Sequence, residues 1–233
     1  MIIKKNNKEM KALLKRVIDS KKNKDLIKKY SNFYLKNKGY TMIDEKTYIN
    51  NLKIAEKAKN ITGDIVECGV WRGGMIAGIA ELLGPTSKYF LYDSYEGLPD
   101  AKEIDGALAL DWQNNSDGEH YHDNCKAEIN FAKEAMTNTG VEFELIKGWF
   151  DSTVPQNKHE KISLLRLDAD WYDSTIICLK YLFPKVVSGG IIIIDDYYVW
   201  EGCSKAIHDY LSEIKSDCRI YQMDNKVAYI IKN

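Results

Sequence analysis

Two pairs of aspartates in the second half of the chain have the residue types and spacing of a metal site. Asp168 and Asp170 directly follow one short apolar run, and Asp195 and Asp196 directly follow another. The segment between the runs, residues 173–181, alternates polar and apolar residues at helical spacing. A strand–helix–strand unit of this kind makes its two strands parallel, so both acid pairs emerge at one edge of the sheet. Aspartates at strand ends also cap helices, but two adjacent pairs need a counter-charge, and a hard divalent cation such as Mg2+ is the simplest one.

A glycine-containing loop follows the first apolar strand of the chain. The strand is predicted at residues 64–70, and the loop contains Gly69, Gly73 and Gly74 before an apolar helix. Glycines let a ligand approach the backbone, and the start of the helix offers free N–H groups. Asp93 ends the next predicted strand 19 residues after Gly74, where folds of this kind hold the ribose hydroxyls of a nucleoside. The pattern favours a nucleotide-like cofactor over a purely structural turn.

Two further segments contain side chains suited to binding. Residues 101–125 show no periodicity, which is typical of a lid or binding loop, although an ordinary surface loop is the alternative. Trp149 and Phe150 follow a predicted strand and have the ring faces to sandwich an adenine, with Asp151 or Ser152 accepting its amino hydrogens. Aromatic residues that merely cover the sheet edge are the competing interpretation.

The remaining periodicities predict an α/β fold with one core. The chain should form a Rossmann-like, mostly parallel sheet, and its last strand should be antiparallel because only a short turn precedes it. The other expected elements are helices at residues 5–38 (two, broken near 21–24), 44–59, 75–83, 124–138 and 203–214, and strands at 88–92, 142–147, 163–167, 190–194, 219–223 and 227–231.

Composition narrows the class of protein. The 233 residues have a net charge of −1, yet residues 1–40 contain 13 Lys or Arg and three acids. This basic arm has the apolar spacing of amphipathic helices, so we expect helices with a solvated lysine face and no nucleic-acid partner. We find no apolar run near the ~20 residues of a membrane span and no signal-peptide pattern, which predicts a cytoplasmic protein. Residues 1–60 are expected to form a helical lid or oligomerisation segment, and residues 61–233 the Rossmann-like domain.

The motifs ECGVWRGG, YDSYEGLPD, GWFDSTVP, LLRLDADWYDST and GGIIIIDDY occur in this order. Together they resemble the macrocin O-methyltransferase family over roughly residues 40–215. The resemblance implies a class I methyltransferase fold, S-adenosylmethionine and Mg2+ as cofactors, and a sugar hydroxyl as the methyl acceptor.

The resemblance also implies roles for individual residues. Asp168, Asp195 and Asp196 would bind the metal, with Asp170 close by. The segment GYTMI would fold over the cofactor. The residues assigned to the cofactor on this basis are Thr41, Met42, Glu67, Gly69, Gly73, Asp93, Ser94, Trp149, Phe150, Asp151, Ser152 and Asp168.

The chemistry expected is transfer of a methyl group to a metal-bound hydroxyl of a glycan or other small-molecule acceptor. Asp168 or Asp170 is the preferred proton acceptor, and His120 or His122 of the lid is the alternative. Two other functions stay open: methylation of a catechol-like small diol, with Trp112, Trp171 and Trp200 as pocket walls, and a non-enzymatic cofactor-binding or nucleic-acid-binding module. A homodimer or higher homo-oligomer is expected.

Overall fold

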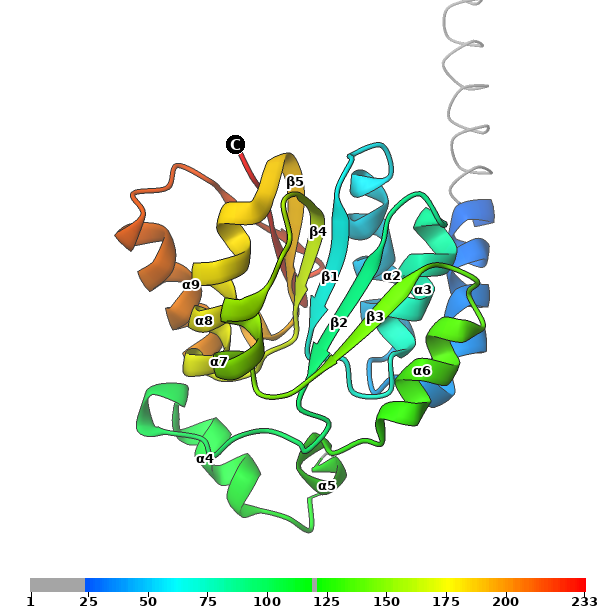
Figure 1. Ribbon diagram of the computed structural model, residues 1–233. Coiled ribbons are helices and arrows are strands. Elements are labelled where there is room, and N and C mark those ends of the chain that lie inside the picture. Colours follow the sequence, from blue (N-terminus) through cyan, green and yellow to red (C-terminus); the bar gives the residue numbers. More distant parts are fainter. Residues whose placement is uncertain (1–23, 119–120) are drawn as a thin grey trace, which may run out of the picture.

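A seven-stranded sheet forms the centre of the protein (Figure 1). The computed structural model describes residues 24–118 and 121–233. The strand order is β3-β2-β1-β4-β5-β7-β6, and β7 is antiparallel to both of its neighbours, as predicted. The strands are β1 (Asp64–Cys68), β2 (Tyr89–Asp93), β3 (Phe143–Lys147), β4 (Ile162–Leu167), β5 (Val186–Ile194), β6 (Ile220–Met223) and β7 (Val227–Ile231).

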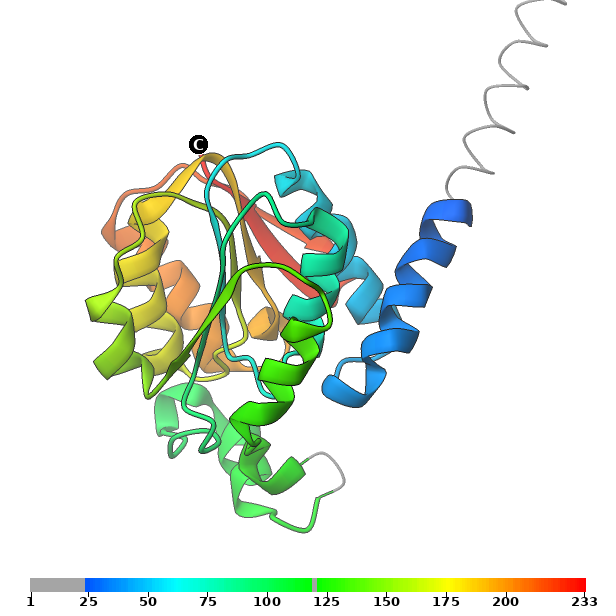
Figure 2. The same ribbon diagram turned by 45° about the vertical axis from the view of Figure 1, so that its right-hand side comes forward.

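Helices cover both faces of the sheet (Figures 1 and 2). One face carries α2, α3 and α6, with a further helix over residues 24–37 outside them, and the other face carries α7, α8 and α9. The lid helices α4 and α5 lie beyond the carboxyl ends of the strands. The bounds are α2 (Glu45–Ala55), α3 (Gly74–Leu83), α4 (Ala107–Asn114), α5 (His122–Cys125), α6 (Ile129–Thr137), α7 (Phe150–Thr153), α8 (Tyr172–Leu182) and α9 (Glu201–Glu213).

The isoleucine run of β5 explains how one strand contributes to two cores. Successive side chains of a strand point to opposite faces. Ile191 and Ile193 therefore pack in the cluster that contains α2 and α3, whereas Ile192 and Ile194 pack in the cluster that contains α8 and α9. All four are at most 1 % exposed, as expected for a strand buried on both faces.

Glycines allow α2 to pack closely on α3. The Tyr48 hydroxyl of α2 donates a hydrogen bond to the carbonyl oxygen of Gly74 at 2.9 Å. A Cβ at Gly78 would lie only 1.9 Å from that hydroxyl oxygen, so only glycine fits there. This contact fixes α2 against the sheet and brings its polar face to the carboxyl edge.

The lid is more ordered than the sequence predicts. Residues 107–114 form α4 inside a segment expected to be irregular, because Ala109 is fully buried and Trp112 packs on other aromatic rings. The helix predicted from residue 124 begins instead at Ile129, since residues 122–125 all have positive φ values between 48° and 59°. Of the helices predicted at 5–38, the part before residue 24 lies outside the described residues.

Within the described part of the chain, every helix is too short or too polar to cross a lipid bilayer.

Candidate active site

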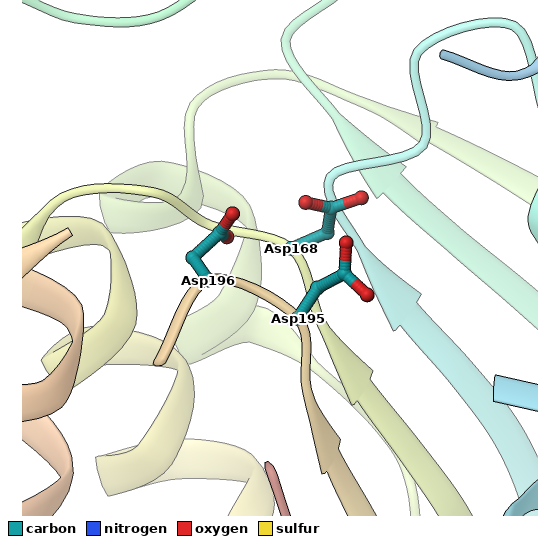
Figure 3. Close-up of side chains that lie close together, drawn as sticks. All are labelled: Asp168, Asp195 and Asp196. Atoms are coloured by element: carbon teal, nitrogen blue, oxygen red, sulfur yellow. The ribbon is translucent and has the colours of Figure 1, made fainter. Parts of the chain in front are cut away.

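Three of the four predicted aspartates converge at the carboxyl edge of the sheet. Asp168 follows β4, and Asp195 and Asp196 follow β5 (Figure 3). One carboxylate oxygen from each lies within 4.8 Å of the other two. An all-oxygen donor set of this size suits a hard divalent cation. The geometry therefore fits the predicted Mg2+ site, although the cation itself stays a prediction.

The counter-charge of this cluster is a buried arginine that the sequence reasoning missed. Arg166 lies in β4 and is 1 % exposed. Its Nη1 lies 2.9 Å from Glu67 Oε1 and 2.8 Å from Asp168 Oδ2, and its Nη2 lies 2.9 Å from Asp195 Oδ1. The acids therefore do not depend on a metal alone for their counter-charge, because the permanent guanidinium charge of Arg166 lies among them. A charged residue inside an apolar strand was the available signal.

Helix α2 completes the cluster through Asn51, which is fully buried. Its side-chain oxygen accepts a hydrogen bond from Arg166 Nε at 3.1 Å, and its amide nitrogen donates to Asp195 Oδ1 at 3.1 Å. Arg166 and Asn51 thus hold Asp195 from two sides, and each ligand aspartate keeps an oxygen that Arg166 does not engage. Nothing in the local sequence around residue 51 indicates this role.

Burial shifts the acids of the cluster toward their protonated forms. The pKa of Glu67 rises to about 8 and that of Asp168 to about 6, in both cases mainly because burial disfavours the charged form. The pKa of Asp196 is also raised well above its usual range by burial and by the neighbouring aspartates. Burial tends to lower the pKa of Arg166, but the charges of Asp195, Asp168 and Glu67 outweigh it and keep the guanidinium protonated. A bound cation would compete with these protons.

Asp170 lies beside the cluster and is held in place by other groups. Its backbone N–H donates to Asp196 Oδ2 at 3.1 Å, and its side chain accepts a hydrogen bond from Trp200 Nε1 at 2.9 Å. Its φ of 53° is in the left-handed region. Asp170 therefore connects the metal-ligand candidates to the aromatic residues of the lid base.

Three tryptophans pack on one another beneath the lid. The ring centroids of Trp171 and Trp200 are 5.1 Å apart, and Trp112 of α4 lies about equally close to both, at 6.1 and 5.9 Å. Trp171 is 1 % exposed and Trp200 9 % exposed. These rings anchor α4 to the sheet, and Trp171 also lines the cavity next to the acid cluster.

A cavity of about 260 Å3 lies beside the acid cluster, at the ends of β2, β3 and β4. It brings together many of the residues predicted to bind the adenosine half of a cofactor. Ser152 donates a hydrogen bond to Asp151 Oδ1 at 2.9 Å, and Asp151 is the one of the two that lines the cavity. The predicted residues in its lining are Asp93, Ser94, Trp149, Phe150, Asp151 and Asp168.

Asp93 organises the two loops at this edge. Its Oδ2 accepts hydrogen bonds from the backbone N–H groups of Val70 and Trp71, at 2.7 and 2.8 Å, and its Oδ1 accepts one from Tyr95 at 2.6 Å. A carboxylate offers about four acceptor positions, so capacity remains at Oδ1 for a ribose hydroxyl. Burial raises the pKa of Asp93, while these three hydrogen bonds oppose the rise.

The opposite end of a cofactor would meet the glycine loop. Gly69 has φ 86°, and a Cβ there would lie 1.7 Å from the Asp168 carbonyl oxygen. Glu67 pairs with Arg166 through Oε1, whereas its Oε2 is buried without a hydrogen-bond partner in the described chain. An unpaired buried acceptor fits the amino group of a methionine moiety.

The segment that contains Thr41 and Met42 covers the start of α3. A Cβ at Gly74 would lie 2.6 Å from the Tyr40 carbonyl and 2.9 Å from Thr41 Cβ, so the two segments are in close contact. Gly73, with φ 83°, is the residue before α3. Met42 is 41 % exposed, which leaves its side chain accessible to a ligand at this edge.

The two candidate histidines of the lid differ in their outcome. His120 lies outside the described residues. His122 is exposed at the start of α5, and its ring meets the edge of Trp71 with a centroid distance of 6.3 Å. The structure thus places His122 next to the glycine loop.

Comparison with known proteins adds a family match. The model of the macrocin-O-methyltransferase family matches residues 2–232. A Streptomyces olivaceus protein, 8-demethyl-8-(2,3-dimethoxy-alpha-L-rhamnosyl)-tetracenomycin-C 4'-O-methyltransferase, is 33 % identical over 66 % of this chain, and the match spans 59 % of that relative's length. Mycinamicin III 3''-O-methyltransferase of Micromonospora griseorubida is 29 % identical over 82 % of this chain and 77 % of its own length.

A solved structure shows the same architecture. The O-methyltransferase NovP superposes with a TM-score of 0.70 at 28 % sequence identity, covering 83 % of this chain and 82 % of its own. The parallel sheet with an antiparallel β7 is therefore that of class I methyltransferases.

Proposed function

Because this chain belongs to the macrocin O-methyltransferase family, we propose that it methylates a hydroxyl oxygen of a sugar or glycoside with the help of a divalent cation. That it is an O-methyltransferase follows from the family, and its dependence on S-adenosylmethionine follows from the fold. Relatives that are named as methyltransferases of a rhamnosyl group and of mycinamicin support the sugar acceptor. The observation that carries the metal is the convergence of Asp168, Asp195 and Asp196.

The residues around the 260 Å3 cavity fit the cofactor. Trp149 and Phe150 offer ring faces to the adenine, Asp93 keeps acceptor capacity for the ribose, and Glu67 Oε2 is free for the amino group. S-adenosylmethionine supplies an electrophilic methyl group when it is bound. Asp168 lines both this cavity and the acid cluster, so the two sites meet at one residue.

Asp168, Asp195 and Asp196 would hold the divalent cation through their carboxylate oxygens. A cation at this place lowers the pKa of a bound hydroxyl and orients it. The protein's own contribution is to fix the ligands: Arg166 and Asn51 hold Asp195, and Arg166 also holds Asp168. Such support of the ligands keeps them at working distance without a large entropic cost on binding.

Asp168 is the proton acceptor that we favour. It belongs both to the acid cluster that would hold the hydroxyl's metal and to the lining of the cavity that would hold the cofactor, so it lies where the proton is released. Asp170 is engaged with Trp200 Nε1, and burial together with the charge of Asp168 raises its pKa strongly, so it is suited to orienting the site.

Calorimetry with the full chain tests this proposal. S-adenosylmethionine and Mg2+ would be titrated separately into wild type, into an Asp195→Asn/Asp196→Asn variant, and into the control Asp209→Asn, which changes an exposed aspartate of α9. We expect cofactor binding in all three proteins and Mg2+ binding only in wild type and the control. Methyl transfer to sugar acceptors should be observed in wild type and the control and lost in the Asp195→Asn/Asp196→Asn variant. Absence of cofactor binding in wild type would contradict the assignment, and full activity in a chelator would contradict the metal.

A further inference from the structure

A second groove lies next to the acid cluster, separated from it by α5. Its volume is about 610 Å3, and it is formed by the loops after β1 and β2, by the segment from α5 to α6, and by the end of β3. Asp123 of α5 faces this groove, whereas burial and the charges of Asp170 and Asp168 raise the pKa of Cys125 two residues later. The lining residues that matter below are Arg72, Tyr95, Asp123, Lys126, Phe131 and Lys147.

Two aromatic rings lie against the guanidinium of Arg72 in this groove. Its guanidinium carbon lies 4.3 Å from the ring centroid of Trp71 and 4.7 Å from that of Phe131. Cation–π contacts at these distances restrict where the guanidinium can lie. Among residues 24–118 and 121–233, Arg72 has no carboxylate within ion-pair distance, whereas Lys147 pairs with Glu96 at 3.3 Å. Arg72 is therefore an oriented cation without an anion.

Buried donors without acceptors occur in the lining of this groove and beside it. Trp71 Nε1, Arg72 Nε and Tyr95 Oη are all buried and make no hydrogen bond within the described chain. Arg72 and Tyr95 line the groove, and Trp71 precedes Arg72 in the chain. Buried polar atoms are almost always paired in folded proteins, so these exceptions call for an explanation. Each of the three carries an N–H or O–H, which means that the missing partner is an acceptor.

The backbone at Trp71 and Tyr95 is strained and is held in this conformation by hydrogen bonds to Asp93. Trp71 has φ 49° and Tyr95 has φ 58°, values that bulky residues rarely adopt. Asp93 accepts a hydrogen bond from the backbone N–H of each, at 2.8 and 2.6 Å. Strain of this kind persists where the surroundings enforce it, and it is concentrated at ligand sites.

We propose that this groove binds an oxyanion, phosphate or carboxylate, that the acceptor molecule carries outside the sugar ring that is methylated. The planar donor fork of Arg72 matches both groups. Lys147 is already paired with Glu96, so Arg72 and Lys126 are the cations of the lining that remain for a ligand. This inference rests on the proposed function, because it assigns the groove to the methyl acceptor.

The distance between the two sites limits the acceptor. Arg72 follows β1 and Tyr95 follows β2, which are one and two strands from β4 and two and three strands from β5 in the sheet. With strands about 4.8 Å apart, these positions lie roughly 5–10 Å across the sheet from Asp168 and roughly 10–14 Å from Asp195 and Asp196. A sugar joined to a phosphate or diphosphate, or to an acidic sugar, has this reach.

Binding of simple oxyanions to the full chain tests the proposal without any methyl transfer. Inorganic pyrophosphate and glucuronate would be titrated into wild type, into Arg72→Met, which keeps an apolar chain between the two rings, and into Arg219→Met, which removes an exposed arginine near β6. We expect wild type and Arg219→Met to bind at least one of the two, and Arg72→Met to bind it roughly tenfold more weakly. The stronger probe identifies phosphate or carboxylate as the class.

S-adenosylmethionine binding, measured on the same samples, separates the possible failures. Unchanged cofactor binding in Arg72→Met shows that the variant is folded and that the loss is local. Equal oxyanion binding in wild type and Arg72→Met, or no oxyanion binding with normal cofactor binding, would overturn the inference and leave the proposed function intact. Oxyanion binding in a protein that does not bind the cofactor would overturn the acceptor role of the groove together with the proposed function.

Discussion

The two halves of the sheet's carboxyl edge satisfy their polar groups in opposite ways. At the ends of β4 and β5, Arg166 contacts three carboxylates and Asn51 ties the group to α2. At the ends of β1 and β2, Trp71, Arg72 and Tyr95 keep buried donors without acceptors among the described residues. In the first region the carboxylates of Glu67, Asp168 and Asp195 are paired with Arg166, and Glu67 Oε2 is the acceptor left over, whereas the second region has several donors whose partners are missing. We infer that contacts within the protein hold the acid cluster in place, whereas the donors at the ends of β1 and β2 are paired only when the acceptor binds.

Backbone strain follows the same division. Ten non-glycine residues of the described chain have positive φ, and seven of them lie in the loops and lid at this edge. Only Asp170 among the seven belongs to the acid cluster. The seven are Trp71, Tyr95, His122, Asp123, Asn124, Cys125 and Asp170.

Removing the guanidinium of Arg166 should have the largest effect on the free energy of unfolding. Arg166→Met leaves Glu67, Asp168 and Asp195 buried without their counter-charge, and breaking a buried charge pair costs about 3–5 kcal/mol. Urea unfolding should show a loss of this size, with Arg219→Met close to wild type. A loss below about 1 kcal/mol would mean that the acid cluster does not depend on Arg166.

The metal-free protein should become less stable as pH rises. The raised pKa values of Glu67, about 8, and Asp168, about 6, mean that the folded protein binds more protons than the unfolded chain between about pH 5 and pH 8. The free energy of unfolding should then fall with pH, by at most about 1.4 kcal/mol per unit for each group. Denaturant titrations across this range measure the slope.

Two controls sharpen the pH experiment. Glu67→Gln removes one titrating group and should flatten the upper part of the curve. Mg2+ favours the charged acids, so it should stabilise the protein more at pH 8 than at pH 5. A free energy of unfolding that rises through this range in metal-free buffer would contradict the assigned pKa directions.

A substitution that weakens the lid should increase local opening of the lid without lowering the global stability of the protein. Asn124 has φ 55°, its side chain bonds the Leu98 carbonyl at 2.8 Å, and its carbonyl oxygen accepts the Leu98 N–H at 3.0 Å. Asn124→Ala loses the side-chain bond to Leu98, the bond that Asn124 Oδ1 accepts from Gln113 Nε2 at 3.1 Å, and the tolerance of asparagine for this conformation, at a local cost of about 1–2 kcal/mol. Hydrogen exchange at Leu98 should accelerate roughly tenfold, while the midpoint of global unfolding stays unchanged.

The exposed neighbour Asn114 provides the matched lid control. Asn114→Ala should leave exchange at Leu98 as in wild type. If Asn124→Ala lowered global stability as much as Arg166→Met does, the lid and the acid cluster would form one cooperative unit, and the contrast between the two regions would fail.

The smallest effect is expected at His122. Since its ring packs against Trp71 of the glycine loop, His122→Gln should reduce the rate of methyl transfer by less than about threefold, with an unchanged pH–rate profile. A loss of about 100-fold or more, or the disappearance of a limb of that profile, would instead make His122 the base.

Much of the fold could be predicted from local patterns. The apolar runs and the helical spacing of residues 173–181 predicted that β4 and β5 are parallel, and the short turn before β7 predicted that β7 is antiparallel to β6, because side-chain periodicity and connection length are properties of neighbouring residues. The same rules placed Asp168, Asp195 and Asp196 at one edge, since the carboxyl ends of parallel strands meet there.

Only the tertiary structure decided how that edge is balanced. Arg166 and Asn51 are 115 residues apart, and their hydrogen bond depends on how α2 packs over α3 through Tyr48 and Gly78. The pairing of Arg72 with Trp71 and Phe131 likewise joins the glycine loop to α6. Contacts between distant segments depend on the closeness with which helices and loops pack, and no periodicity along the chain records that distance.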